Sequence, residues 1–283
     1  MPLTLTLLAP SSIPIEVQGI TPDQLRDKPL AQIERLPVLH GNRQQPLGEL
    51  FAAAGSAADE QIEFIGECGN VHWIGAGMSA GCVRVTGAAG RHAGSGMLGG
   101  ELLIDGSAGD WAGAEMRRGL LRILGSAGDH AGGAYVGAQR GMTGGSLLIH
   151  GNAGNETGRV MRRGLIAVAG CCGDYAAFNM LAGSVMVFGA IGRRPGAGMR
   201  RGTLALLGSS PAVLLPTFRR AAALQSTTYR MMLRHLEQLQ FPLEASLYSC
   251  VPEIFRGDLA AGGKGEILRL SSGMLSRELC VDA

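Results

Sequence analysis

Three pairs of adjacent arginines are the residues of this sequence best suited to binding a charged ligand. Each pair lies in the phrase Met-Arg-Arg-Gly, and the pairs are Arg117-Arg118, Arg162-Arg163 and Arg200-Arg201. A guanidinium group binds carboxylates and phosphates through two parallel hydrogen bonds. A row of such pairs could hold an extended polyanion or an acidic partner, and the same pairs could instead be solvated charges at corners of the fold.

Histidines and acids also recur, but their spacing does not form a metal site or a catalytic group. His92 and His130 occupy the same place in two repeats that a third repeat separates. If the repeats stack like strands, these histidines lie about 10 Å apart, too far to share one metal ion. We therefore expect solvated corners at the histidines. A row of residues that follow glycines is expected to cap turns rather than to bind calcium; these are Asp110, Asp129, Asn155 and Asp174.

The sequence contains no motif of a catalytic or cofactor-binding site. Its six cysteines include no Cys-x-x-Cys pair, which disfavours a zinc ribbon or an iron–sulfur cluster and indicates buried, reduced thiols. It also lacks a His-Glu-x-x-His motif, a P-loop and a Rossmann fingerprint. We predict that the chain has no catalytic residues, no metal ligands and no cofactor of its own.

The arginine pairs lie at a fixed position of a sequence repeat. A glycine closes a short apolar strand at seven places, at intervals of 19, 19, 26, 19, 19 and 19 residues, and the phrase Met-x-x-Gly keeps the same intervals. Two Val, Leu or Ile side chains of each strand share one face, and the glycines allow tight corners. The repeat predicts a right-handed parallel β-helix of about seven 19-residue coils. The closing glycines are Gly87, Gly106, Gly125, Gly151, Gly170, Gly189 and Gly208.

Both ends of such a stack need covering, because their strand edges would otherwise be unpaired. We predict an N-terminal α/β capping segment at residues 1–60, the repeats at 61–209, and a C-terminal helical cap and tail at 210–283. Ser226 is expected to cap a helix over residues 227–240, whose apolar stripe needs a surface to cover. We expect this helix, or otherwise another subunit, to cover the outward positions of the late coils, which are Ala167, Ala169, Met186, Phe188, Ala205 and Leu207.

Composition disfavours several classes of partner and location. The net charge is +2, without a basic domain or an aromatic platform, so we expect no nucleic-acid partner. No run approaches the ~20 apolar residues of a membrane helix, and the start "MPLTLTLLAP" lacks the basic region of a signal peptide, so we expect a cytoplasmic protein. Lys28 and Lys264 are the only lysines, which favours a mesophilic bacterium over a hyperthermophile.

The phrases "GSAGDWAGAEMRRG" and "GSAGDHAGGAYVGAQRGMTGG" resemble the C subunit of the formylmethanofuran dehydrogenase family. So do "HGNRQQPLGELF" at 40–51, the seven-residue expansion of one coil between Gly132 and Gly141, "LLPTF" at 214–218 and "GDLAAGGKGEIL" at 257–268. The resemblance covers nearly the whole chain. The C-terminal domain of glutamate synthase large subunits shares the glycine-rich coils and is the related alternative.

The resemblance implies a component of a larger enzyme. In methylotrophic bacteria, the related formyltransferase/hydrolase complex transfers a formyl group from tetrahydromethanopterin to methylofuran and hydrolyses it to formate, during formaldehyde oxidation. In methanogenic archaea, the C subunit accompanies a molybdenum or tungsten, iron–sulfur enzyme that reduces CO2 to formylmethanofuran. The excess of arginine over lysine favours the bacterial complex.

The same resemblance implies roles for the partners and for the arginines. The C subunit would be a non-catalytic scaffold for the A, B and D subunits, with the metal-dependent hydrolase in the A subunit and the formyltransferase in the D subunit. Because methylofuran carries a polyglutamate tail, the six paired arginines are candidate contacts for that tail or for an acidic partner. The alternatives are a component of an archaeal-type dehydrogenase, a glutamate-synthase-like scaffold and an independent β-helical enzyme that acts on an acidic polysaccharide.

Overall fold

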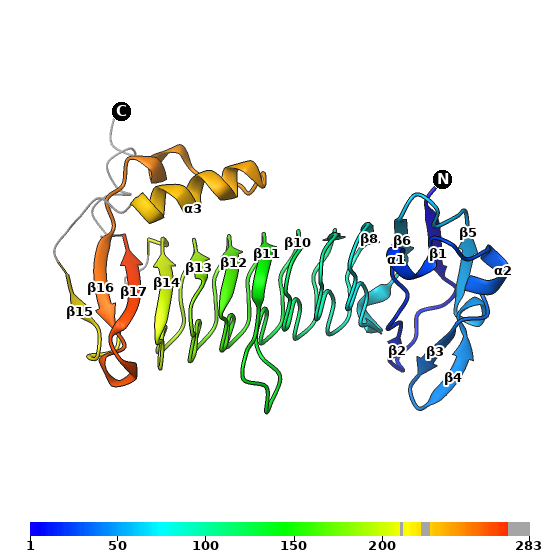
Figure 1. The fold of residues 1–283 in the computed structure, drawn as a ribbon, viewed down its shortest axis with the longest axis horizontal. Coiled ribbons are helices and arrows are strands. Elements are labelled where there is room, and N and C mark those ends of the chain that lie inside the picture. The colour runs from blue at the N-terminus through cyan, green and yellow to red at the C-terminus, as the bar shows by residue number, and fades with distance from the viewer. Residues whose placement is uncertain (210–211, 222–226, 271–283) are drawn as a thin grey trace, which may run out of the picture.

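The computed structural model describes residues 1–209, 212–221 and 227–270 and is mainly β (Figure 1). A 13-stranded sheet runs the length of the molecule, and most of its neighbouring strands are parallel. A four-stranded sheet lies at the N-terminal end. The prediction of a mainly β protein with a long parallel arrangement of strands is therefore confirmed.

The N-terminal segment combines short strands with two helices of four residues, α1 (Pro22–Leu25) and α2 (Leu30–Ile33). Strand β5 runs antiparallel to β1, so an antiparallel strand forms this edge of the large sheet. The large sheet receives β1 (Leu3–Leu7), β5 (Phe51–Ala54) and β6 (Gln61–Ile65). The small sheet consists of β2 (Ile15–Glu16), β3 (Pro37–His40), β4 (Arg43–Pro46) and β7 (Val71–His72), and two 3-10 turns are η1 (Leu47–Glu49) and η2 (Cys68–Asn70).

Each predicted repeat contributes one strand to the middle of the large sheet. The parallel register places equivalent residues side by side, so that Leu102 pairs with Leu121 and Leu121 with Leu147. All fourteen side chains that the alternation predicts to point inward are at most 4% exposed, as expected for strands that bury one face. The strands are β8 (Cys82–Thr86), β9 (Glu101–Ile104), β10 (Leu120–Ile123), β11 (Thr143–Ile149), β12 (Arg163–Val168), β13 (Ser184–Val187) and β14 (Arg201–Leu206).

The parallel part of the sheet continues past the predicted repeats at both ends. Ile62 of β6 pairs with Val83, and Ile267 of β17 (Lys264–Arg269) pairs with Leu204. Both side chains are buried. The periodicity did not reveal these two strands, because the segments around them do not keep the 19-residue interval.

A second column of pairing follows the strands. Isolated parallel bridges connect Ala89, Ala108, Ala127, Ala153, Cys172 and Ile191 in sequence order. Successive repeats are therefore in contact at two separate places, at the strand and at this bridge. The residue at each bridge is small or apolar, and all but Ile191 are buried.

The row of acids connects one repeat to the next. The Asp110 carboxylate accepts the backbone N–H of Asp129 at 3.0 Å, and Asp129 in turn accepts that of Asn155 at 2.6 Å. Asp174 accepts the Arg193 backbone N–H at 2.7 Å, which, with the Arg193 side chain, holds the pKa of this carboxyl below its usual value. The expectation was that these side chains cap turns; the hydrogen bonds instead join each side chain to the backbone of the next repeat, 19 or 26 residues along the chain.

The C-terminal helix α3 (Thr227–Gln238) lies beside the last strands of the stack (Figure 1). Its buried residues Tyr229, Met232, Leu233 and Leu236 form one apolar cluster with Ala167, Met186, Ala205 and Leu207 of the outward strand face. The Arg122 guanidinium donates a 2.6 Å hydrogen bond to the Leu239 carbonyl just beyond the helix. The prediction that this helix covers the late coils is confirmed, and its predicted cap Ser226 lies outside the described residues.

Strands, rather than the helix alone, complete the C-terminal end. Beyond β17, the large sheet adds β16 (Glu253–Gly257) and β15 (Arg219–Arg220), both antiparallel to their neighbours. The prediction of a purely helical cap was therefore wrong. Helix α3 covers the face of the sheet, whereas the strands β16 and β15 form its C-terminal edge. The remaining 3-10 turns are η3 (Ala245–Tyr248) and η4 (Leu259–Ala261).

Candidate functional site

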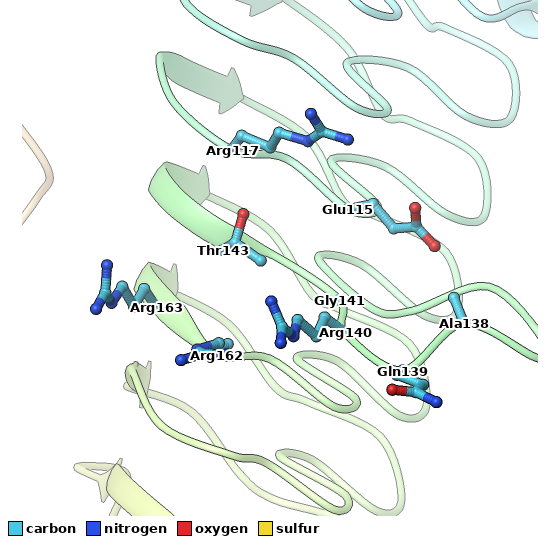
Figure 2. A pocket seen from close by; sticks show the side chains of 9 residues that line it. All are labelled: Glu115, Arg117, Ala138, Gln139, Arg140, Gly141, Thr143, Arg162 and Arg163. Atoms are coloured by element: carbon cyan, nitrogen blue, oxygen red, sulfur yellow. The ribbon is translucent and has the colours of Figure 1, made fainter.

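The paired arginines border an open hollow of about 770 Å³ beside strands β11 and β12 (Figure 2). Arg117, Arg162 and Arg163 line it together with Arg140, which comes from the expanded coil. The complete lining is Glu115, Arg117, Ala138, Gln139, Arg140, Gly141, Thr143, Arg162 and Arg163. Glu115 is therefore the one acid among four basic side chains, and the lining favours an anion.

An adjoining hollow of about 480 Å³ extends this surface toward Arg200. The two hollows share Gln139, Arg140 and Arg162, so they adjoin and are described together as one surface region. We call it the arginine groove and define it by Arg117, Arg140, Arg162, Arg163 and Arg200. From the coil of Arg117 to that of Arg200 the groove spans four coil steps, roughly 19 Å at the spacing of parallel strands.

Not all six predicted arginines come together in this groove. Arg118 and Arg201 line neither hollow, although both are exposed. Within the described part of the chain, none of the five groove arginines makes an ion pair. Their charges are therefore available to a ligand or a partner.

The backbone fixes where the groove arginines lie. The methionine before each pair is fully buried, so the arginine that follows it turns outward. The Arg117 backbone N–H donates to the Met97 carbonyl at 2.8 Å, and Arg162 and Arg200 donate to Met142 and Met180 at 2.9 and 2.8 Å. Equivalent arginines are thus held in one column by the same bond that stacks the coils.

Arg140 was not among the arginines predicted from the sequence. It lies in the expanded coil, which carries Thr143-Gly144 at the place where three other coils carry arginine pairs. One signal in the sequence could have revealed it. The single 26-residue coil has no arginine pair after its methionine, but its added residues include Arg140. Arg140 therefore makes the row of charges continuous between the coils of Arg117 and Arg162.

The expectation of solvated corners at His92 and His130 holds only in part, because both residues have left-handed backbones, at φ +63° and +62°, but their side chains are half-buried. The His92 ring stacks on Trp73 and the His130 ring on Trp111, each with ring centroids 4.2 Å apart. Tyr135, from the expanded coil, stacks on Trp111 at 5.0 Å and contacts His92 at 5.5 Å. These five rings form a half-buried cluster that joins the expanded coil to three consecutive coils.

Three half-buried histidines should make the free energy of unfolding depend on pH. Burial lowers the pKa of His72, His92 and His150 below the usual 6.5. As the pH falls through 6.5, the unfolded chain binds protons before the folded chain does, so the free energy of unfolding decreases. We expect a lower thermal unfolding midpoint at about pH 5.5 than at about pH 7.5, measured by circular dichroism. The variant His150→Phe should lose part of this dependence, and an equal midpoint at both pH values would contradict the prediction.

Of the five described cysteines, Cys68 and Cys172 are buried and Cys171 is exposed, so the expectation of buried thiols holds only in part. Burial raises the pKa of the Cys68 and Cys172 thiols to about 11, so both are protonated near neutral pH. Among the residues placed in the structure, no three of His, Cys, Asp and Glu gather as metal ligands. In the same residues, no helix is long and apolar enough to cross a membrane.

No protein-family model matches the chain. A stretch of 92 residues is 37% identical to the C subunit of the molybdenum-containing formylmethanofuran dehydrogenase 1 of Methanothermobacter thermautotrophicus, covering 31% of this chain and 23% of that protein. In the same organism, the C subunit of the tungsten-containing formylmethanofuran dehydrogenase 2 is 37% identical over 86 residues, or 29% of this chain and 32% of that protein. The chain thus matches only a quarter to a third of the length of these curated relatives.

A solved structure extends the similarity to almost the whole chain. A chain in the crystal structure of the formyltransferase/hydrolase complex from Methylorubrum extorquens, with methylofuran, is 36% identical with a TM-score of 0.88. The alignment covers 95% of this chain and 99% of that chain. This chain belongs to the C-subunit family of formylmethanofuran dehydrogenases. The family resemblance seen in the glycine-rich coils is therefore confirmed over nearly their full extent.

Proposed function

We propose that this member of the C-subunit family is the structural subunit of a formyltransferase/hydrolase complex. That complex would convert formyl-tetrahydromethanopterin, through formyl-methylofuran, to formate in one-carbon oxidation in the cytoplasm. The nearly full-length similarity to a chain of the Methylorubrum extorquens complex carries the proposal. The archaeal-type dehydrogenase is the second candidate, since the curated relatives are named as its subunits, but those matches cover less than a third of the chain.

The proposal assigns the chemistry to partner subunits. The A, B and D subunits would be the partners, with the metal ions of the hydrolase in the A subunit and the formyl transfer in the D subunit. This chain would supply no catalytic residue, metal ligand or cofactor, and it would hold the other subunits and the methylofuran carrier in place. The arginine groove is open rather than enclosed, and this supports a binding role over a catalytic one.

We also infer that the stacked coils are a right-handed parallel β-helix. The two columns of parallel pairing, at the strands and at the isolated bridges, support it. On this basis the chain divides into a capping segment at 1–60, the helix of coils at 61–209 and the C-terminal part at 210–283.

Co-expression with the other subunits tests the proposed function. We expect the chain to co-purify in a complex that forms formate from formyl-tetrahydromethanopterin, whereas the purified chain alone shows no turnover. Turnover by the chain alone, including cleavage of an acidic polysaccharide, would reject a non-catalytic role. Co-purification with a molybdenum or tungsten enzyme would favour the archaeal-type dehydrogenase, and co-purification with a flavin and iron–sulfur protein would favour a glutamate-synthase-like scaffold.

The arginine groove is proposed to bind the polyglutamate tail of methylofuran or an acidic partner. The proposed contacts are Arg117, Arg118, Arg162, Arg163, Arg200 and Arg201, and the proposal is supported by the fact that four of them, Arg117, Arg162, Arg163 and Arg200, line the two adjoining hollows. Guanidinium groups without an ion-pair partner suit a chain of carboxylates. Arg140 is added to the proposed contacts on the same ground.

Charge reversal inside and outside the groove tests the tail contact. We expect Arg117→Glu with Arg162→Glu and Arg200→Glu to lower the methylofuran content of the purified complex about tenfold or more, measured by mass spectrometry. Arg118→Glu with Arg201→Glu is the matched control, because these arginines lie outside the groove. Unchanged methylofuran in the first variant, or an equal loss in the control, would reject the groove as the tail site.

A further inference from the structure

The seven-residue expansion of one coil forms a loop that projects from the stack near β11 (Figure 1). We define it as the expansion loop, residues 133–141. Because the other coils keep their 19-residue interval, the loop is an addition that stacking the coils does not require. We propose that the expansion loop is a preformed docking element, which inserts Val136 into an apolar pocket, bordered by carboxylates, on a partner subunit.

The base of the loop is firmly held. The Tyr135 hydroxyl is 2.8 Å from Nδ1 of His92 and 2.6 Å from Oγ of Ser95, and its ring stacks on Trp111. The Tyr135 backbone N–H donates to the Glu115 carboxylate at 3.3 Å. A side chain with two hydroxyl contacts and a stacked ring has little freedom to reorient, so the loop keeps one conformation before any partner binds.

The backbone on both sides of the loop is also tied to the stack. The Ala134 N–H donates to the Arg159 carbonyl at 3.1 Å, and the Gly141 N–H donates to the Val160 carbonyl at 3.0 Å. Both ends of the loop are thus bonded to the same neighbouring coil. Because Ala134 and Gly141 are both bonded to the stack, only residues 136–140 form the tip of the loop.

The tip presents an apolar side chain to solvent. The Ala138 N–H donates to the Tyr135 carbonyl at 3.0 Å, and this turn directs Val136 outward, where it is 85% exposed. Gly137, at φ +88°, supplies the left-handed residue that the turn needs. A valine held in the open on a fixed turn loses little conformational entropy when it is buried by a partner.

The charges beside the tip define the partner further. Gln139 and Arg140 follow Val136 by three and four residues in the same loop and are exposed, and Arg140 makes no ion pair within the described residues. Arginine is enriched at the centres of protein interfaces, where its charge pairs with a carboxylate of the partner. The complementary surface is an apolar pocket with aspartate or glutamate at its border. This inference rests on the proposed assembly with other subunits.

Paired valine substitutions test the docking element. We expect Val136→Asp to weaken binding of the purified partner subunits about tenfold or more, with Arg140→Glu also weakening it. Val213→Asp is the matched control, because Val213 is likewise 85% exposed but lies outside the loop. All three variants should keep the wild-type thermal unfolding midpoint, since the changed side chains are exposed.

The outcomes separate this inference from the proposed function. If the wild type and Val213→Asp assemble and Val136→Asp assembles equally tightly, the docking role is overturned while the proposed complex stands. If the wild type binds none of the partners, the proposed function and the inference both fail. Weaker binding of Val136→Asp and Arg140→Glu, with full binding of Val213→Asp, supports the inference.

Discussion

Replacing Gly119 by alanine is expected to cost about 2–6 kcal/mol of the free energy of unfolding. Gly119 precedes β10 in the left-handed backbone region, at φ +89°, where alanine is strained. A Cβ atom there would lie 2.6 Å from the Gly100 carbonyl oxygen of the preceding coil. Because that neighbour is backbone, the coils would have to move apart, and the pairing of β9 with β10 would loosen. Urea denaturation followed by circular dichroism measures the loss.

Gly96 provides the matched control for this prediction. It is also left-handed, at φ +65°, but a Cβ atom there meets nothing within 4 Å. Glu115 occupies the equivalent place in the next coil at φ +54°, which shows that the coil accommodates a side chain there. Gly96→Ala should therefore cost no more than about 1 kcal/mol. Equal losses for the two variants would show that backbone strain, rather than the close approach of coils, sets the need for Gly119.

The variant Leu233→Ala is expected to lower the free energy of unfolding by about 2–5 kcal/mol and to loosen α3 from the sheet. Leu233 is fully buried in the cluster that joins the helix to Ala167, Met186 and Ala205. The small alanines opposite cannot fill the space that the lost side chain leaves. Looser packing should expose the outward apolar face, so the variant should bind more of a hydrophobic dye such as anilinonaphthalene sulfonate.

Met231 on the same helix is the control for the packing prediction. It is 65% exposed, so Met231→Ala should change the free energy of unfolding by less than about 0.5 kcal/mol. A small loss for Leu233→Ala as well, with no increase in dye binding, would mean that the helix contributes little to covering the sheet.

The regular part of the fold was predictable because two periods agree in the sequence. Alternation within each strand marks the inward side chains, such as Leu121 and Ile123, and the 19-residue interval places them in register with those of the next coil. It was also predictable from the sequence that α3 covers the late coils. An apolar helical stripe and an outward apolar strand face both need burial, and they satisfy each other.

The prediction failed where the interval is broken. The strands β6 and β17 extend the stack from outside the seven repeats, and Arg140, which lines both hollows, lies in the one expanded coil. The histidine corners were predicted only in part for a similar reason. Tyr135, from outside the regular interval, reaches back over His92 and Trp111 and removes them partly from solvent.

The sequence by itself determined the repeat, the buried face of each strand, the glycine corners and the row of arginine pairs, because each depends on local alternation and on one fixed interval. Only the tertiary structure decided which arginines share a groove. Arg163 lines it, whereas Arg118 and Arg201, which have the same place in their repeats, do not. The repeats are not equivalent here, because the expanded coil contributes Gln139 and Arg140 to both hollows. The position of the expansion loop also depends on the tertiary structure. It is held by contacts between residues up to 43 positions apart in the sequence, which no local pattern encodes.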